Sequence, residues 1–336
     1  MKRNQAPGSQ RRLSSKKNIW LIRPLFLLLS IVVSCSGGSD GDSLAGGGIG
    51  GTGIISVGNI TALGSIFVNG IEFQTTRATV IISGISRDEK DLHVGMVVKV
   101  EGTVNADGNT GNAARVTYDH NVEGPINRID LERSKLDVMG QTVLVDAQTI
   151  IAGLGNISRL ADLAADDVVE ISGLTDAEGN IAATRITLKT TGSRAGVVGR
   201  VGCMTGTTFK INALTVDYSN AILSQFGSAG IQQGDVVDVT GYLASPSTLI
   251  AETIEKKNAG FKDNSDVEFE GFIDRIYYMD QSISGFSLIL PFGLETVELD
   301  ASTVIAGGKP IRAGARVQVK GTIQNNMIQA KWLRLL

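Results

Sequence analysis

The sequence is short of the residues on which most catalytic and metal sites depend. Its 336 residues include only two histidines, His93 and His120, and two cysteines, Cys35 and Cys203. Neither histidine lies near the other or near a thiol in the sequence, so zinc sites and Cys/His nucleophiles have no obvious set of residues to use. We expect both histidines to be exposed polar residues, and we expect no metal site and no cofactor.

Positive charge is also scarce once the first 34 residues are set aside. Those residues carry seven of the 31 Lys and Arg residues and none of the 34 Asp and Glu residues, which leaves a net charge of −10 on the remainder. Proteins that bind a phosphate backbone need a positive field. Nucleic acid is therefore not expected as a partner.

The chain begins with a basic, polar segment that is followed by the short, mostly apolar run 25–33. A charged start, a short apolar core and a small residue before the cut are typical of a secretory signal peptide, here residues 1–34. The run is too short to span a bilayer as a helix. Residues 32–35 (VVSC) resemble the bacterial lipobox, which implies cleavage before Cys35 and lipidation of that cysteine. A plain signal peptide and an uncleaved anchor are the alternatives.

A lipidated Cys35 would attach the protein to a membrane, because acyl chains contribute roughly 0.8 kcal/mol per buried methylene. Ser36 follows the cysteine, rather than an Asp, which favours the outer membrane if the host is Gram-negative. Residues 35–53 have too little apolar surface to fold and predict a flexible glycine-rich tether. Cys203 would then have no disulfide partner, and we expect it to be a buried structural thiol.

Glycine is abundant, at 41 residues, whereas proline is scarce, at six. This balance favours many short strands joined by glycine turns. The segment 95–102 (GMVVKVEG) alternates apolar and polar residues, as in a strand that buries one face, and similar segments follow at 167–173, 234–241 and 314–321. Their closing glycines, Gly102, Gly173, Gly241 and Gly321, are 71, 68 and 80 residues apart, about the length of a small β-domain.

Other features recur in the same order around each copy. An opening strand comes first, then a hairpin, of which Asn69-Gly70 is the clearest turn because both residues tolerate the positive φ of a type I′ turn. A Thr-x-Ile element and a connector precede the last two strands, and the connector at 157–165 has apolar residues at helical spacing. Three strands, a connector that can be a helix and two further strands are the order of the OB-fold.

The sequence therefore predicts an all-β chain of four tandem, five-stranded OB-like barrels after a signal peptide and a tether. We place the barrels at residues 54–120, 121–192, 193–257 and 258–336. A unit of about 65 residues is near the lower limit for an independent core, so we expect neighbouring barrels to pack against one another. The polar link 258–266 is the expected position of any hinge.

The lipobox, the glycine-rich segment 47–53 and the segment 64–73 (GSIFVNGIEF) together resemble bacterial secreted lipoproteins of domain-of-unknown-function family 5666. The resemblance is best over residues 47–118 and loosest in the third copy, where Asn220 replaces the usual Thr. It implies tandem OB-like barrels, and it brings no activity and no binding residues.

Aromatic residues make up only 5% of the chain, but eight of the 17 lie in the last 76 residues. Tyr277 and Tyr278 are adjacent, so in a strand they would point to opposite faces and one would lie outside the core. We predict an aromatic docking face for a protein or a glycan on the last barrel, formed by Tyr277, Tyr278, Phe286, Phe292 and Trp332. An aromatic-rich core is the alternative.

Acidic residues offer two further hypotheses. Asp130, Glu132, Asp166 and Asp167 could supply the paired carboxylates of a hydrolase. The segments 105–111 and 176–180 hold oxygen ligands that would suit Ca²⁺, although ordinary β-turns have the same composition and are the favoured interpretation.

The sequence favours a non-enzymatic lipoprotein of the cell envelope whose barrels bind or scaffold an envelope protein or polysaccharide. The alternatives are a weak carboxylate-based hydrolase at a barrel interface and a passive structural spacer.

Overall fold

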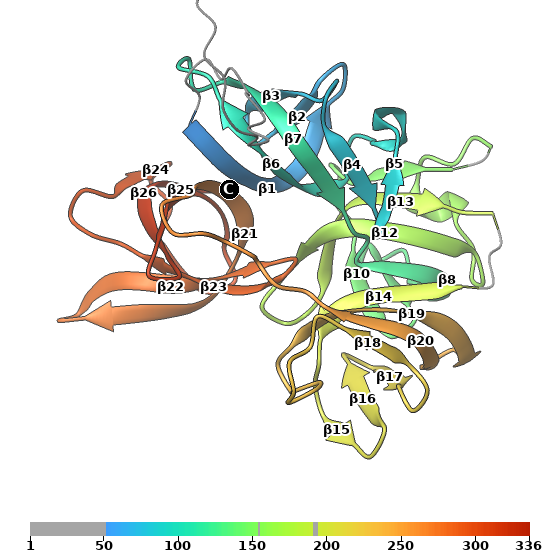
Figure 1. Cartoon of the computed structure of the whole chain (residues 1–336). Coiled ribbons are helices and arrows are strands. Elements are labelled where there is room, and N and C mark those ends of the chain that lie inside the picture. Colours follow the sequence, from blue (N-terminus) through green and yellow to red (C-terminus); the bar gives the residue numbers. More distant parts are fainter. Residues whose placement is uncertain (1–51, 154, 191–193) are drawn as a thin grey trace, which may run out of the picture. The chain divides into compact units, whose positions relative to one another are not determined.

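The computed structural model describes residues 52–153, 155–190 and 194–336, which lie in the compact unit 48–336. The predicted signal peptide, Cys35 and nearly all of the predicted tether lie outside the described residues. The described residues form 26 strands and two single-turn 3₁₀ helices, Glu89–Asp91 (η1) and Leu160–Asp162 (η2). The predicted all-β fold is therefore confirmed (Figure 1). In this part of the chain, no helix has the length and apolar character needed to cross a membrane.

Barrel 1 shows the topology that the four repeats share. Its main strands are β1 (Thr52–Ala62), β2 (Ile66–Val68), β3 (Ile71–Gln74), β6 (Val97–Val104) and β7 (Thr110–Tyr118). β1 pairs with β2 and β6, β2 with β3, and β6 with β7, all antiparallel, whereas β3 and β7 are parallel. The ring closes in the order β1-β2-β3-β7-β6, as expected of an OB-like barrel. The Thr-x-Ile element forms β4 (Thr79–Ile82), which pairs with β7 and with β5 (Ile85–Arg87).

The other three barrels repeat this order. Barrel 2 consists of β8 (Val122–Asp130), β9 (Lys135–Val138), β10 (Gln141–Leu144), β11 (Ile150–Ala152), β12 (Val168–Thr175) and β13 (Ile181–Leu188). Barrel 3 consists of β14 (Ala195–Arg200), β15 (Met204–Thr205), β16 (Thr208–Ile211), β17 (Leu214–Asp217), β18 (Ile222–Ser224), β19 (Val236–Ser245) and β20 (Thr248–Lys256). Barrel 4 consists of β21 (Asp266–Met279), β22 (Ser282–Leu290), β23 (Gly293–Glu298), β24 (Val304–Ala306), β25 (Arg316–Gln324) and β26 (Met327–Leu335).

Barrel 3 closes its ring without a strand pairing between β14 and β15 or β16. Beyond the end of β14, Gly202 N donates to Lys210 O at 2.7 Å and Lys210 N donates to Cys203 O at 3.1 Å. Cys203 lies on this seam with its side chain exposed, so the prediction of a buried thiol is wrong. The residue takes part in the barrel through its backbone and not through its side chain.

The closing glycines do not end their strands. β6 continues two residues beyond Gly102, and Gly173, Gly241 and Gly321 likewise lie inside β12, β19 and β25. At each glycine the register with the partner strand shifts, as at a β-bulge. A β-carbon there would overlap a carbonyl oxygen of the partner strand, for example that of Asn112 beside Gly102. Close approach of two backbones is therefore what requires glycine.

The connectors contain no α-helix, so the helical spacing at 157–165 was misleading. The only helical element in segment 157–165 is η2. At its start, the side chain of Asp162 accepts the backbone N–H groups of Ser158 and Arg159. The side chain of Asp167 then accepts Ala164 N at 2.8 Å. Both carboxylates therefore bind backbone N–H groups beside the single turn.

The barrels are joined in pairs through their first strands. β8 and β14 are antiparallel, and the cores of barrels 2 and 3 form one continuous cluster that includes Val122 and Val197, each fully buried. β1 and β21 are parallel from Ile54↔Asp266 to Val57↔Phe269, which links barrels 1 and 4. Burying an aliphatic side chain contributes roughly 1.5–3 kcal/mol, so neighbouring barrels stabilise one another.

Two asparagines in hairpin turns reinforce these pairs. Asn69 and Gly70 have φ of 54° and 85°, which confirms the predicted turn, and the Asn69 amide donates to Ser56 Oγ, Val57 O and Glu268 O, each at 3.0 Å. In barrel 3, Asn212 has φ of 51°, and its side-chain amide donates to Gln141 Oε1 and Gly179 O of barrel 2. Each turn therefore fixes the position of a neighbouring barrel.

The link between barrels 3 and 4 is anchored to barrel 4. The ring of Phe261 lies 5.2 Å from that of Phe269 and 5.3 Å from that of Phe292, measured between centroids. These contacts pack Phe261 against barrel 4, so residues 258–260 are the part of the link in which we expect any hinge.

Candidate functional site

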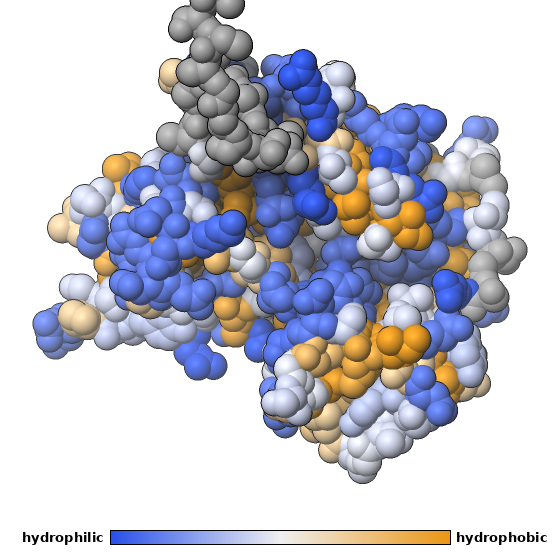
Figure 2. Space-filling model, in the orientation of Figure 1, coloured by the Kyte–Doolittle hydropathy of each residue, from blue (hydrophilic) through white to orange (hydrophobic). Residues whose placement is uncertain are grey.

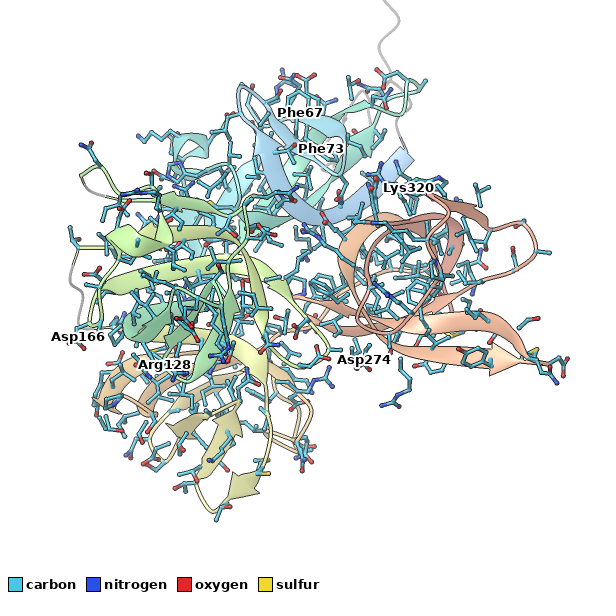
Figure 3. All side chains as sticks on the ribbon, turned by 180° about the vertical axis from the view of Figure 1, so that it is seen from behind. Phe67, Phe73, Arg128, Asp166, Asp274 and Lys320 are labelled. Carbon is cyan, nitrogen blue, oxygen red and sulfur yellow. The ribbon has the colours of Figure 1, made fainter. Side chains whose placement is uncertain are left out.

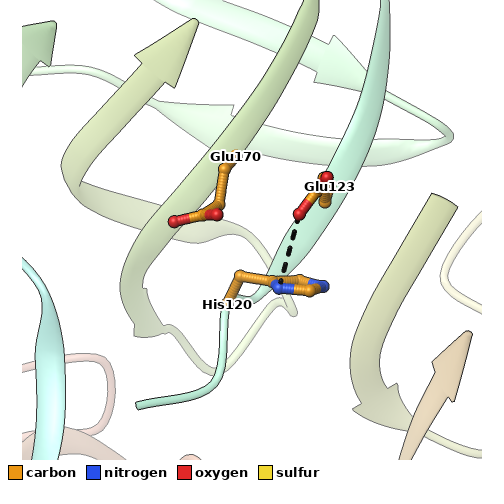
Figure 4. Close-up of side chains that lie close together, drawn as sticks. All are labelled: His120, Glu123 and Glu170. Atoms are coloured by element: carbon orange, nitrogen blue, oxygen red, sulfur yellow. Dashed lines mark ion pairs between the residues drawn. The ribbon is translucent and has the colours of Figure 1, made fainter. Parts of the chain in front are cut away.

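The buried interface between barrels 1 and 2 holds the one His/Asp/Glu group of metal-binding size in the described ranges: His120, Glu123 and Glu170 (Figure 4). His120 is only 9% exposed, so the prediction that it is an exposed polar residue is wrong. Its Nδ1 lies 3.2 Å from Ser83 Oγ and 3.9 Å from Glu123 Oε2. Its Nε2 faces the backbone of Gly196, where an added β-carbon would lie 2.6 Å away.

Glu170 already has a cation beside it. Lys189 Nζ donates to Glu170 Oε2 and Tyr118 Oη donates to Glu170 Oε1, both at 2.8 Å. Burial alone would raise the pKa of Glu170, but the bonds from Lys189 and Tyr118 outweigh it and lower the pKa. The cluster is thus a charge-paired contact between two barrels, and a metal ion would have to displace the Lys189 ammonium group.

A cavity of about 280 Å³ lies next to His120, lined by residues from all four barrels. One of its charged groups, Lys257, is paired twice: its Nζ lies 3.0 Å from both Asp119 and Asp238. Burial alone would lower the pKa of Lys257, but the two carboxylates outweigh it and raise the pKa well above its usual value. This pairing ties the end of barrel 3 to Asp119, which directly follows the last strand of barrel 1.

Two of the four carboxylates proposed for a hydrolase, Asp130 and Asp167, serve local turns. Asp130 accepts Arg133 N at 3.0 Å and pairs with the Arg133 guanidinium at 3.1 Å, and Asp167 caps the backbone at Ala164. Asp166 has φ of 69° in the turn before β12. None of these aspartates belongs to a described group of metal-binding size.

The two acidic segments considered for Ca²⁺ are β-turns whose carboxylates bind their own backbone. Asp107 Oδ1 accepts Asn109 N and Thr110 N, each at 2.9 Å. Asp176 Oδ1 accepts Glu178 N at 3.0 Å and Asn180 N at 2.8 Å. This is the Asx-turn geometry expected of ordinary hairpin reversals.

The five predicted aromatic residues do not form one face. Phe286 is fully buried in the core of barrel 4, because its strand directs it inward, so it is not a binding residue. Phe292 is partly buried against Phe261 and Phe269 and belongs to the same core. The remaining three, Tyr277, Tyr278 and Trp332, lie on the outside of barrel 4 in two separate places.

The first place is the outer end of the β21–β22 hairpin, residues 275–283, which we call the arm. Figure 1 shows this hairpin extending beyond the rest of its barrel. Tyr277, Tyr278 and Met279 are 37%, 65% and 68% exposed. Asp280 and Gln281, with φ of 47° and 66°, form the reversal at the tip. The sequence missed Met279, although the run of large side chains beside a turn was a usable signal.

The second place is an open groove of about 540 Å³, which we call the Trp332 groove. It is lined by Asn69, Gly70, Gln318, Lys320, Trp332 and Arg334. Lys320 Nζ and Arg334 Cζ lie 5.7 and 5.9 Å from the centroid of the Trp332 ring, within range of a cation–π interaction. Figure 3 shows Lys320 on the side of barrel 4 next to barrel 1. The sequence had no signal for the two cations, because strand pairing brings them to Trp332.

Apolar residues are also exposed on two edge strands. Ile222 and Leu223 on β18 are 70% and 41% exposed, and Val304 and Ile305 on β24 are 56% and 51% exposed. Figure 2 shows apolar surface over barrel 3 in the region of β18. The corresponding strand of barrel 2, β11, has Ile151 buried.

Comparison with known proteins identifies the family of the repeats. A family model described as "Domain of unknown function (DUF5666)" matches four times, at residues 52–117, 123–187, 197–255 and 281–334. The chain belongs to the DUF5666 family. Each DUF5666 match falls on one of the four barrels.

The other comparisons add little to the DUF5666 assignment. None of the curated proteins matches the chain. A solved structure described as drosophila Unr CSD456 is similar over 65% of this chain and 97% of its own, with 15% sequence identity and a TM-score of 0.15.

Proposed function

We propose that the chain is a non-enzymatic binding module of the cell envelope and that barrel 4 carries its recognition surface. The observation that carries this proposal is the arm, where Tyr278 and Met279 are about two-thirds exposed at the end of the longest strand. Large apolar side chains that are exposed next to one another mark sites where partners bind, and tyrosine is enriched at such sites. The partner class that we favour is an envelope protein or polysaccharide.

The other barrels would act as the scaffold that positions barrel 4. β21 is the first strand of barrel 4, and its first four residues, 266–269, pair with β1 while its C-terminal end forms the arm. Through this pairing, barrel 1 would hold the base of the strand that carries Tyr277 and Tyr278. A passive spacer would have no need for an arm with exposed aromatic residues.

We further propose that a lipid on Cys35 anchors the protein to a membrane, the outer one in a Gram-negative host. Replacing this residue, Cys35→Ser, should then move the protein from the detergent phase to the aqueous phase in phase partitioning. An unchanged detergent-phase fraction would mean that something other than lipid on Cys35 holds the protein to membranes.

The binding proposal is tested by capturing partners from the protein's own cell envelope. The bait is the complete chain, because deleting barrel 4 would also remove the strand paired with β1. The variant Tyr278→Ser combined with Met279→Ser should lose the captured partner, since both side chains are exposed and the fold does not depend on them.

A matched control is Tyr242→Ser, at a tyrosine on barrel 3 that is 50% exposed. This control should capture the partner as well as the wild-type protein does. Equal capture by the arm variant and the wild type would place recognition elsewhere, and equal loss in both variants would indicate nonspecific adhesion.

A further inference from the structure

The strand pair β12–β13 of barrel 2 is equivalent to the strand pair β25–β26 of barrel 4, but the two pairs have different neighbours. In barrel 2, Ser172 pairs with Arg185 just before the bulge glycine, and in barrel 4, Lys320 pairs with Trp332 at the corresponding place. Trp332 therefore occupies on barrel 4 the position that Arg185 occupies on barrel 2. The outer faces of these two strand pairs can be compared directly.

In barrel 2 this outer face is covered by barrel 1. Ser172 Oγ accepts Val97 N at 2.8 Å, and Arg185 Nη1 donates to Val94 O at 3.0 Å. Barrel 4 has the open Trp332 groove at the corresponding face. Within the described residues, barrel 1 touches this face only at its turn Asn69-Gly70, where Asn69 O accepts a hydrogen bond of 3.1 Å from Gln318 Nε2. The face that a neighbouring barrel covers in barrel 2 is thus only partly covered in barrel 4.

The groove combines one aromatic ring with an available cation. Arg334 is exposed, and its Nη2 donates to Gln318 Oε1 at 3.1 Å. Within residues 52–153, 155–190 and 194–336, no carboxylate forms an ion pair with Arg334, whereas Lys320 lies 3.0 Å from Glu268 Oε1. A guanidinium group binds a carboxylate through two parallel hydrogen bonds. The indole ring beside it has a flat apolar surface, part of which Lys320 and Arg334 cover at cation–π distance.

The charge of the surrounding chain also favours an anionic ligand. Residues 301–336 contain six Lys and Arg residues and no Asp or Glu, although residues 35–336 as a whole carry a net charge of −10. Three of the six basic residues are paired with acidic residues of β21, namely Arg316, Lys320 and Lys331. The other three, Lys309, Arg312 and Arg334, have no acidic side chain paired with them within the described residues.

We propose that the Trp332 groove binds a carboxylated polysaccharide. One sugar ring stacks on the indole of Trp332, and the carboxylate of the same or the next sugar pairs with Arg334. The proposal rests on the proposed function, because it names the partner class for a second site on the same barrel.

Two other occupants fit the groove less well. A protein partner is expected to insert an apolar anchor into a pocket, whereas this groove is open and its ring is flanked by charged and amide groups. Single-stranded nucleic acid binds to several stacking rings along a basic track. The groove has one ring, and the body of the protein is acidic.

The test is a titration of the processed protein, residues 35–336, with short oligogalacturonates. Trp20 and Trp332 are the only tryptophans, and Trp20 lies in the predicted signal peptide, so the fluorescence of the processed protein reports on the groove. We expect saturable binding that weakens as salt is added. Neutral galacto-oligosaccharides of the same length should bind more weakly.

Arg334→Gln should weaken oligogalacturonate binding roughly tenfold or more, as expected for a lost charged hydrogen bond. The matched control is Arg128→Gln, an exposed arginine on barrel 2 (Figure 3), which should leave binding unchanged. Because Arg334 is exposed, its replacement tests the site without removing the ring.

Three results would overturn the proposal: no binding to the wild type, equal binding to the wild type and Arg334→Gln, or tighter binding of oligothymidylate or the neutral sugar. If envelope capture through the arm persists while oligogalacturonate fails to bind, the proposed function stands and only the groove's ligand is wrong. If both fail, the binding proposal itself is contradicted.

Discussion

The hydroxyl of Tyr118, at the end of barrel 1, donates a hydrogen bond of 2.8 Å to Glu170 Oε1 in barrel 2. Tyr118 is 1% exposed, and its pKa is raised well above the usual value, first by burial and then by the Glu170 charge. It therefore remains a donor at all physiological pH values. Lys189 binds the other oxygen of the same carboxylate, so one buried charge holds two barrels together.

Tyr118→Phe should lower the free energy of unfolding by about 1.5–3 kcal/mol, the usual value for a hydrogen bond to a charged group. Chemical denaturation measures this loss. The control is Tyr218→Phe, since the Tyr218 hydroxyl makes an exposed bond of 3.1 Å to Gly206 O within barrel 3. A loss no larger than that of the control would show that the bond between the barrels contributes little.

Gly95 and Gly234 occupy the same turn in barrels 1 and 3 but in different surroundings. Both have positive φ, of 90° and 94°. A β-carbon on Gly95 would lie 2.7 Å from Thr184 O in barrel 2, whereas one on Gly234 would meet nothing within 4 Å. Comparing substitutions at these two glycines therefore separates the cost of backbone strain from the cost of a clash between barrels.

We predict that Gly234→Ala costs about 1 kcal/mol through positive φ alone, and that Gly95→Ala costs roughly 1–3 kcal/mol more because it also forces the barrels apart. Thermal unfolding of the two variants measures the difference. Equal losses would mean that barrels 1 and 2 separate readily, contrary to the buried interface described above.

The barrels could be predicted from sequence because their determinants are local. Alternating side chains mark the strands, and Asn69-Gly70 marks a turn that only residues tolerant of positive φ can make. The bulge glycines were visible as well, although their role was not. Whether Gly102 ends a strand or lets a partner carbonyl approach depends on Asn112, which belongs to another strand.

What could not be predicted depends on contacts between repeats. His120 follows the last strand of barrel 1 and would be exposed if the barrels were independent, but packing against Gly196 of barrel 3 buries it. Aromatic composition alone could not separate Phe286, which is in the core, from Tyr278, which is on the arm. Strand register decides that distinction.

Glu295 on β23 should make the stability of barrel 4 depend on pH. Burial raises the pKa of this carboxyl group to about 7, and the side chain borders a groove next to Phe261 and Phe292. The unfolded chain releases this proton near the usual value for glutamate, while the folded protein retains it. The free energy of unfolding therefore falls as the pH rises from the usual pKa of glutamate to about 7, and it stays lowered at higher pH.

Glu295→Gln removes the ionisable group, so it should raise the melting temperature at pH values above about 7 and have little effect below the usual range of glutamate. Glu132→Gln, at an exposed position on barrel 2, serves as the control and should show no such dependence. A stabilisation by Glu295→Gln that is the same at all pH values would contradict the role of burial.

The central claim, that the arm of barrel 4 contacts a partner in the cell envelope, is tested most directly by photo-crosslinking in intact cells. A photoreactive phenylalanine analogue replaces Tyr278 in one strain and Tyr242 in another, both at exposed tyrosines. The account predicts a discrete crosslinked product from position 278 and none from position 242. No product from position 278, or the same products from both positions, would contradict it.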